Sequence, residues 1–262
     1  MGEVIAIVSG KGGCGKSTFA LNIACFIAAS NKKVLLIDEN NGLRTLDILL
    51  GIEAPGLYNF IDYLSNKCSK YDCTIHYDKI NNLDVIMASQ INNENIINAE
   101  KVKEKYAELK EEYEYIILDT PCGVTNGLYS CLNGIDRAMF VITPDNVAVR
   151  NADKIKSILL KNKIFNASMI VNKIEEDLIK KKAQLKNDEI HDLLGLEIVE
   201  SFNMDPNFIL AQGRGESLLN TNTVSEKKLK KLTSKITGKK LNDLIDDSNL
   251  KKRRKIFNLF KK

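Results

Sequence analysis

Long apolar runs are absent from this sequence. No run in the 262 residues approaches the ~20 consecutive apolar residues that a membrane-spanning helix requires. We therefore expect any membrane contact to be peripheral. No secretory signal precedes the first apolar strand pattern, which begins at Val4. The sequence therefore predicts a cytoplasmic chain whose six cysteines stay reduced.

A convincing zinc-binding set is also absent. Cys68 and Cys73 have four residues between them and no matching second pair, and His76 alone does not complete a tetrahedral site. We therefore expect no zinc, and structural roles for the cysteines.

Acidic residues are missing from the end of the chain. The last twelve residues hold seven Lys or Arg and no Asp or Glu. Removing those seven charges from the formal net charge of +4 leaves −3 for residues 1–250. The sequence therefore combines a mildly acidic body, rich enough in hydrophobic residues (44%) for a sizeable core, with a strongly basic tail.

Short apolar runs alternate with helical patterns along the body. The expected strands are 4–8, 33–37, 83–87, 115–118, 138–142 and 168–171, and the expected helices include 17–29, 95–112, 147–160 and 189–194. This order predicts the α/β class, with a mostly parallel twisted sheet and helices on both faces. In such sheets ligands bind beyond the carboxyl ends of the strands, so we expect Gly10, Asp38 and Asp119 to share one edge.

One boundary divides the chain. Residues 243–249 are polar and separate the α/β body, residues 1–242, from the basic segment 250–262. We interpret them as a folded domain, a linker and a separate C-terminal segment.

A phosphate-binding loop lies between the first strand and the first helix. Gly10–Ser17 satisfies G-x-x-x-x-G-K-[ST], whose glycines let backbone N–H groups face phosphates. In this pattern Lys16 reaches the β- and γ-phosphates and the Ser17 hydroxyl binds Mg²⁺. Asp119 is the expected strand-end carboxylate that holds the metal, directly or through water. The sequence therefore predicts ATP or ADP with Mg²⁺.

Lys11 is a second lysine within this loop, and the general motif does not require it. A solvated surface cation is one reading. The reading we favour is that Lys11 neutralises transition-state charge on phosphates, in its own site or across a dimer.

Several segments together resemble one family. The loop 11–18 is similar to the deviant Walker A loop of the ParA/MinD family of P-loop ATPases, and further segments resemble its MinD branch. These segments are 1–4, Gly42–Asp47, Asp119–Gly123, Pro144, Val149–Arg150, Asp153 and 211–216. The resemblance covers essentially the whole chain.

The resemblance implies roles for individual residues. ATP is expected to join two subunits face to face, with Lys11 reaching the partner's phosphates, while Asp38 acts near the magnesium. Asn172 matches the family's adenine-reading asparagine, and Asp205–Pro206 lies in the loop that closes over the base. The implied nucleotide-binding residues are Gly10, Lys11, Gly12, Gly13, Cys14, Gly15, Lys16, Ser17, Thr18, Asn172, Asp205 and Pro206. The implied catalytic residues are Lys11, Lys16, Asp38 and Asn40, and the implied metal ligands are Ser17, Asp38 and Asp119.

Two asparagines depart from the family pattern. The family usually has a second acid two residues after Asp38, where this chain has Asn40, and Asn151 likewise replaces a usual Asp. An amide can orient water but cannot act as a base. We therefore expect ATP binding and dimerisation with slow turnover. Glu39 is the only nearby substitute, and strand alternation aims it elsewhere.

Some relatives in the same superfamily hold iron–sulfur clusters between subunits, which makes Cys122 suggestive. The neighbouring strand end at 87–90 supplies no second cysteine, and a C-terminal C-x-x-C is absent. We expect no iron–sulfur cluster.

The C-terminal segment pairs basic residues with apolar anchors. Its expected membrane-binding residues are Lys251, Lys252, Arg253, Arg254, Lys255, Ile256, Phe257, Leu259, Phe260, Lys261 and Lys262. On a helix the apolar residues fall together, which is typical of an interfacial helix and resembles the family's membrane-targeting tail. Nucleic acid is the less favoured partner, because a basic run alone would not need four large apolar residues.

These features predict an ATPase that dimerises on ATP, binds the anionic inner face of the cell membrane and helps to place the division septum. Its expected protein partners are a division inhibitor and a turnover activator. The alternatives are a flagellar-number regulator of the FlhG type, a ParA-type partition ATPase, and a hydrolysis-impaired scaffold that depends on nucleotide.

Overall fold

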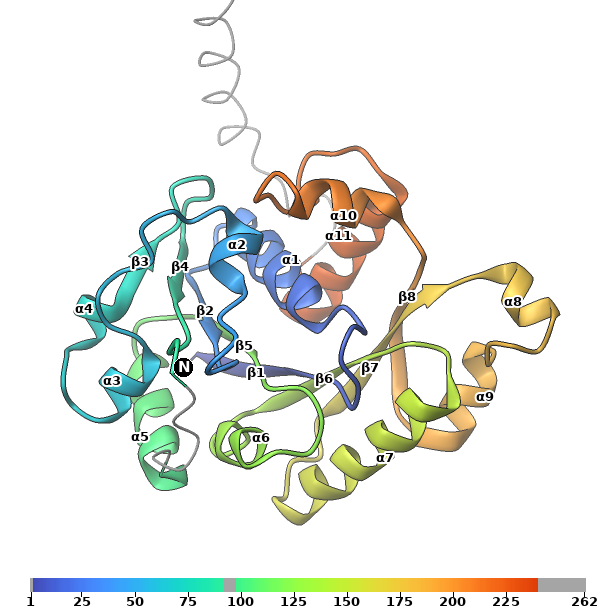
Figure 1. Ribbon diagram of the computed structural model, residues 1–262, viewed down its shortest axis with the longest axis horizontal. Coiled ribbons are helices and arrows are strands. Elements are labelled where there is room, and N and C mark those ends of the chain that lie inside the picture. The colour runs from blue at the N-terminus through green and yellow to red at the C-terminus, as the bar shows by residue number, and fades with distance from the viewer. Residues whose placement is uncertain (1, 92–97, 240–262) are drawn as a thin grey trace, which may run out of the picture.

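The computed structural model describes residues 2–91 and 98–239 and forms one sheet flanked by helices (Figure 1). The strand order in the sheet is β3-β4-β2-β5-β1-β6-β7-β8, and every neighbouring pair is parallel except β3 and β4. Helices α1, α10 and α11 lie on one side of the sheet, and α5, α6 and α7 lie on the other. The predicted α/β class and the mostly parallel sheet are therefore confirmed.

The strands of the described residues are β1 (Glu3–Val8), β2 (Val34–Asp38), β3 (Thr74–His76), β4 (Leu83–Ile86), β5 (Tyr115–Asp119), β6 (Arg137–Ile142), β7 (Ala167–Ile174) and β8 (Glu197–Asn203). The helices are α1 (Lys16–Ala29), α2 (Leu46–Leu50), α3 (Phe60–Leu64), α4 (Lys70–Cys73), α5 (Ala99–Leu109), α6 (Asn126–Cys131), α7 (Asn146–Lys161), α8 (Glu176–Lys180), α9 (Asn187–Leu194), α10 (Pro206–Gln212) and α11 (Val224–Thr237).

The central strands are buried on both faces. Val4–Val8 is completely buried, as are Val34–Ile37 of β2 and Ile116–Leu118 of β5. Such strands need no polar alternation, which explains their continuous apolar runs. Helix α1 is also buried nearly all round, because it lies between the sheet and α11.

The register of the sheet places the polar strand ends at one edge. Strand β5 lies between β1 and β2, and Asp38 of β2 is directly opposite Asp119 of β5. The chain leaves β1 at the same edge and enters the glycine-rich loop. The expected meeting of Gly10, Asp38 and Asp119 at one edge is therefore confirmed.

Each expected strand and helix is present, and most of the differences are at their ends. The helix expected from residue 95 lies partly outside the described residues. Within them, α5 begins at Ala99, where the Asn98 side chain accepts a hydrogen bond from the N–H of Glu100, and it ends at Leu109 rather than at 112. Strands β3 and β8, which lie at the two edges of the sheet, were not expected from the sequence. Strand β8 pairs only with β7, so its half-exposed, partly acidic residues make no continuous apolar run.

The described residues contain no helix that is long and apolar enough to cross a membrane. The expected linker 243–249 and tail 250–262 lie outside the described residues.

Candidate nucleotide-binding site

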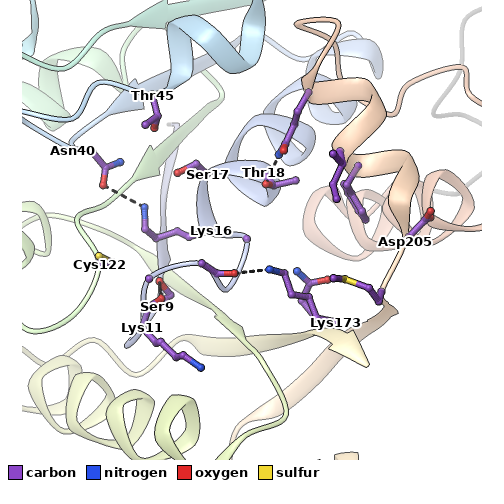
Figure 2. Close-up of a pocket in the computed structure, with 18 of the residues that line it drawn as sticks. Ser9, Lys11, Lys16, Ser17, Thr18, Asn40, Thr45, Cys122, Lys173 and Asp205 are labelled. Atoms are coloured by element: carbon purple, nitrogen blue, oxygen red, sulfur yellow. Dashed lines mark hydrogen bonds between the residues drawn. The ribbon is translucent and has the colours of Figure 1, made fainter. Parts of the chain in front are cut away.

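The glycine-rich loop connects β1 to α1 and borders a pocket of about 440 Å³ (Figure 2). Close packing explains two of its glycines. A Cβ on Gly15, where φ is +98°, would lie 2.7 Å from the Asn172 amide nitrogen, and one on Gly10 would lie 2.4 Å from the Asn151 Cβ. Both residues must therefore be glycine if the loop is to keep its contacts with β7 and α7.

The loop lysine contacts a carboxylate at the neighbouring strand end. Lys16 is almost completely buried, and its Nζ lies 2.5 Å from Asp119 Oδ1 and 3.5 Å from Asn40 Oδ1. A buried cation with a paired carboxylate can release one partner for an incoming anion, because phosphate oxygens satisfy the same ammonium.

Asn40 lies between two buried carboxylates. Its Nδ2 donates to Asp38 Oδ1 at 3.0 Å and to Asp119 Oδ2 at 2.8 Å. Burial and the neighbouring Asp119 raise the pKa of Asp38, and hydrogen bonds from Asn40 oppose that rise. The amide thus lies between two negative charges. A carboxylate in its place would add a third negative charge and increase their repulsion.

Glu39 points to the other face of the sheet, as strand alternation predicts. Its side chain accepts a hydrogen bond from the Tyr106 hydroxyl at 2.8 Å and is also contacted by Cys131. Burial raises the pKa of Glu39 to about 7, although these two hydrogen bonds lower it. Glu39 therefore supplies no carboxylate to the pocket.

The donor set suits magnesium. Ser17 lines the pocket, while Asp38 and Asp119 are buried behind it. Asp38 Oδ2 accepts from the N–H groups of Thr45 and Leu46 at the start of α2, so all four carboxylate oxygens have protein partners. Mg²⁺ favours oxygen ligands and keeps several waters, so carboxylates placed in this way fit contact through water.

Residues from β7 and from the start of α10 form the opposite wall. Asn172 donates from Nδ2 to the Cys14 carbonyl at 2.9 Å, which leaves its Oδ1 as an acceptor. Asp205 lines the pocket and caps α10 by accepting from the N–H of Asn207 at 2.9 Å. Pro206 begins α10 without lining the pocket, whereas Phe208 and Ile209 lie on its wall.

The structure brings most of the expected residues together. Of these, the pocket wall includes Lys11, Gly12, Gly13, Gly15, Lys16, Ser17, Thr18, Asn40, Asn172 and Asp205. Gly10 instead borders a second hollow beside α7, and Cys14 is buried with its thiol 3.7 Å from Thr143 Oγ1. Lys11 is half exposed, and its Nζ lies 3.2 Å from Asp145 Oδ2.

Sequence reasoning missed Lys173 and Gln212. Lys173 Nζ donates to the Gly13 carbonyl at 2.7 Å, and Gln212 Nε2 donates to Thr18 Oγ1 at 2.5 Å. Lys173 follows the expected end of its strand, and no pattern marked it. Gln212 falls in the segment 211–216 that resembles the MinD branch, but the sequence predicted no helix there and assigned it no contact in the site.

The cysteines are not gathered into a metal site in the described part of the chain, where no group of three or more His, Cys, Asp or Glu side chains is placed to hold an ion. Cys122 is exposed and lines the pocket, whereas Cys73 and Cys131 are buried.

A parallel sheet, a glycine loop leading into a helix, and a buried lysine beside a strand-end aspartate define the class of P-loop nucleotide-binding proteins. Comparison with known proteins narrows this class. The family described as AAA domain matches residues 2–155. Among curated proteins, the septum site-determining protein MinD of Synechocystis sp. is 34% identical over 84% of this chain and 82% of its own.

Comparison with solved structures leads to the same family. The MinC:MinD cell division protein complex of Aquifex aeolicus has a TM-score of 0.83 and 31% identity, over 91% of this chain and 97% of that one. MinD from Pyrococcus horikoshii, solved with Mg-ADP, has a TM-score of 0.79, with 90% and 96% coverage; at 21% identity it shows the fold. The chain belongs to the ParA/MinD family of P-loop ATPases, and MinD proteins are among its similar relatives.

Proposed function

We propose that this protein is a MinD-like division-site switch. It binds ATP with Mg²⁺, dimerises, docks on the anionic inner face of the cell membrane and positions a division inhibitor. The observation that carries the proposal is the buried contact of Lys16 with Asp119 and Asn40 at the glycine loop, in a chain of this family. The relative solved as a MinC:MinD cell division protein complex supports a cell division protein as partner.

Nucleotide binding would exchange the partners of Lys16. Its ammonium would move from Asp119 to the β- and γ-phosphates, freeing a carboxylate oxygen toward the water shell of the metal. Ser17 would ligate Mg²⁺ directly, and Asp38 and Asp119 would hold its waters. The metal supplies neutralisation of the charge that develops during phosphoryl transfer.

The base would be read on the opposite wall. Because Asn172 uses its Nδ2 on the Cys14 carbonyl, its free Oδ1 accepts from an amino group. Adenine presents such a group at N6, whereas guanine presents a carbonyl at the equivalent position. The segment from Asp205 and Pro206 to Phe208 would close over the base.

Hydrolysis is expected to be slow. Asn40 occupies the position where the family usually has a second acid, and its amide N–H groups donate to Asp38 and Asp119. This observation also favours a second candidate function, a scaffold that binds ATP and dimerises with little turnover.

The test is cosedimentation with anionic liposomes under ADP and ATP, for the full chain and for a truncation ending at Asn249. Pelleting that requires ATP and is lost on truncation supports the membrane switch. Pelleting that persists long after ATP addition supports slow turnover. No pelleting under either nucleotide would overturn the membrane role and leave the tail to be tested on nucleic acid and protein. DNA binding that is salt-sensitive and survives the truncation would instead indicate a partition ATPase.

A further inference from the structure

Two consecutive residues at the end of β7 hold the glycine loop. Asn172 Nδ2 donates to the Cys14 carbonyl at 2.9 Å. Lys173 Nζ donates to the Gly13 carbonyl at 2.7 Å (Figure 2). Consecutive side chains of a regular strand point to opposite faces, so this arrangement requires an irregular backbone.

The irregularity lies at Lys173, whose φ is +59° and which falls within a register shift between β7 and β8. A left-handed conformation is unfavourable for lysine and persists where the surroundings impose it. Gln184 holds this turn, because its Nε2 donates to the Lys173 carbonyl at 3.1 Å and its Oε1 accepts from the N–H of Glu175 at 2.9 Å. The chain thus maintains an unfavourable backbone that aims the lysine at the loop.

The hydrogen bonds from Asn172 and Lys173 fix the orientation of two peptide groups in the loop. In a trans peptide the carbonyl of one residue and the N–H of the next point in opposite directions, and the described residues contain no cis peptide. Lys173, by holding the Gly13 carbonyl, therefore turns the N–H of Cys14 the other way. Asn172 does the same for the N–H of Gly15, so the end of β7 sets the direction of two consecutive N–H groups in the phosphate loop.

We propose that Lys173 is a positioning residue for nucleotide binding, acting through the Gly13 carbonyl rather than through a phosphate. The inference rests on the proposed ATP site and deepens it. A residue that orients the loop acts on the part of the site that ATP and ADP share. A lysine acting as a phosphate-binding charge would favour ATP, which carries the additional γ-phosphate.

The test compares Lys173→Met, which keeps the length and removes the donor, with Lys173→Gly, which also suits the left-handed backbone. Lys182→Met is the matched control, because Lys182 is exposed, has a φ of +57° and lies outside the pocket wall. Affinities for ATP and ADP are measured by titration with fluorescent nucleotide analogues, alongside thermal melting and single-turnover hydrolysis at saturating ATP.

We expect both Lys173 variants to lose about tenfold in affinity for ATP and equally for ADP, with the rate of hydrolysis of bound ATP changed less than the affinity, and the control to match the wild type. Unchanged affinity in both Lys173 variants, or a loss several times larger for ATP than for ADP, overturns the inference. In either case, nucleotide binding by the wild type would still support the proposed ATP site. A wild-type chain that binds neither nucleotide overturns the proposed function and the inference with it.

Discussion

At the scale of single residues, Asn40 and Asn151, where the family resemblance leads us to expect acids, make different contacts. Asn40 donates to both buried carboxylates of the metal edge, and Asn151 donates to the Gly10 carbonyl at 3.0 Å. Neither contact is open to an ionised aspartate, which has no proton to donate. An aspartate at either position would therefore change the hydrogen bonds at the edge as well as the chemistry there.

Asn40→Asp is expected to speed ATP hydrolysis and to destabilise the folded chain in the absence of Mg²⁺. A carboxylate orients water and accepts a proton, so we expect single-turnover ATP hydrolysis to rise by at least about tenfold. Lost donors and a third clustered charge should lower the free energy of unfolding by about 1–3 kcal/mol without the metal. Asn66→Asp makes the same change on an exposed residue and is the control. Unchanged hydrolysis would show that position 40 does not limit turnover.

Glu39→Gln is expected to remove a pH dependence of stability. Burial raises the pKa of Glu39 from 4.5 to about 7, so between these values the folded chain keeps a proton that the unfolded chain has lost. The free energy of unfolding of the wild type therefore falls as pH rises through this window and then levels off. Gln keeps an acceptor for the Tyr106 hydroxyl but carries no charge. As pH rises through this window, the stability of the variant relative to the wild type should therefore increase by up to about 3 kcal/mol.

Urea unfolding of the nucleotide-free chain across this pH range checks the difference, with Glu111→Gln on an exposed residue as control. A stability difference between Glu39→Gln and wild type that stays constant with pH would contradict the assignment.

At the scale of elements, α2 and the segment after α10 meet through two glycines. A Cβ on Gly215, where φ is +63°, would lie 2.6 Å from Gly51 Cα. The Gly215 carbonyl also accepts from Lys79 Nζ at 2.7 Å and from the Tyr77 hydroxyl at 3.4 Å. The Asp38 carboxylate accepts a hydrogen bond from the N–H of Leu46, the first residue of α2, and α10 supplies part of the pocket wall. The contact between the two glycines therefore joins the proposed metal side of the site to the proposed base side.

Gly215→Ala is expected to separate α2 from α10 and to weaken nucleotide binding. The left-handed backbone and the close approach together should cost about 1–3 kcal/mol of stability. Gly238→Ala is the control, because Gly238 has a φ of +67° and nothing within 4 Å of an added Cβ. Melting temperatures and ATP titrations of both variants check this. Equal loss of affinity in the two variants would rule out a specific link between the elements.

The sequence predicted the central elements well because their residues report burial directly. Runs such as Val4–Val8 and Val34–Ile37 are apolar because both faces of their strands are covered. Edge strand β8 escaped detection because its exposure allows acidic residues. At the site, a motif identified Lys16 and Ser17, whereas Lys173 reaches the loop only through a bulge, and bulges of this kind leave no sequence period to detect.

At the scale of the whole molecule, the charge distribution favours control by dimerisation. Residues 1–250 carry −3, and the last twelve residues carry +7 with four large apolar residues. Each tail offers ~1 kcal/mol per basic residue at an anionic surface, before the cost of ordering a dozen residues. If the chain dimerises as proposed, two tails would act as a bivalent ligand and gain ~10²–10⁴ in avidity over one tail.

In the proposed dimer, Lys11 would connect the bound nucleotide to this bivalent membrane binding. In the single chain its Nζ pairs with Asp145, and such an exposed pair contributes about 0–1 kcal/mol, so its release opposes dimerisation little. Lys11→Ala should therefore bind ATP within a few-fold of wild type yet stay monomeric. Its ATP-dependent binding to anionic liposomes should fall by about 10²-fold although its tail is intact.

Lys67→Ala is the matched control, since Lys67 also forms an exposed ion pair, with Asp62. Light scattering measures the dimer, and liposome pelleting measures the membrane-bound fraction. If Lys11→Ala stays monomeric and still pellets with ATP like wild type, one tail suffices for docking, and ATP must control the membrane through the conformation of the single chain.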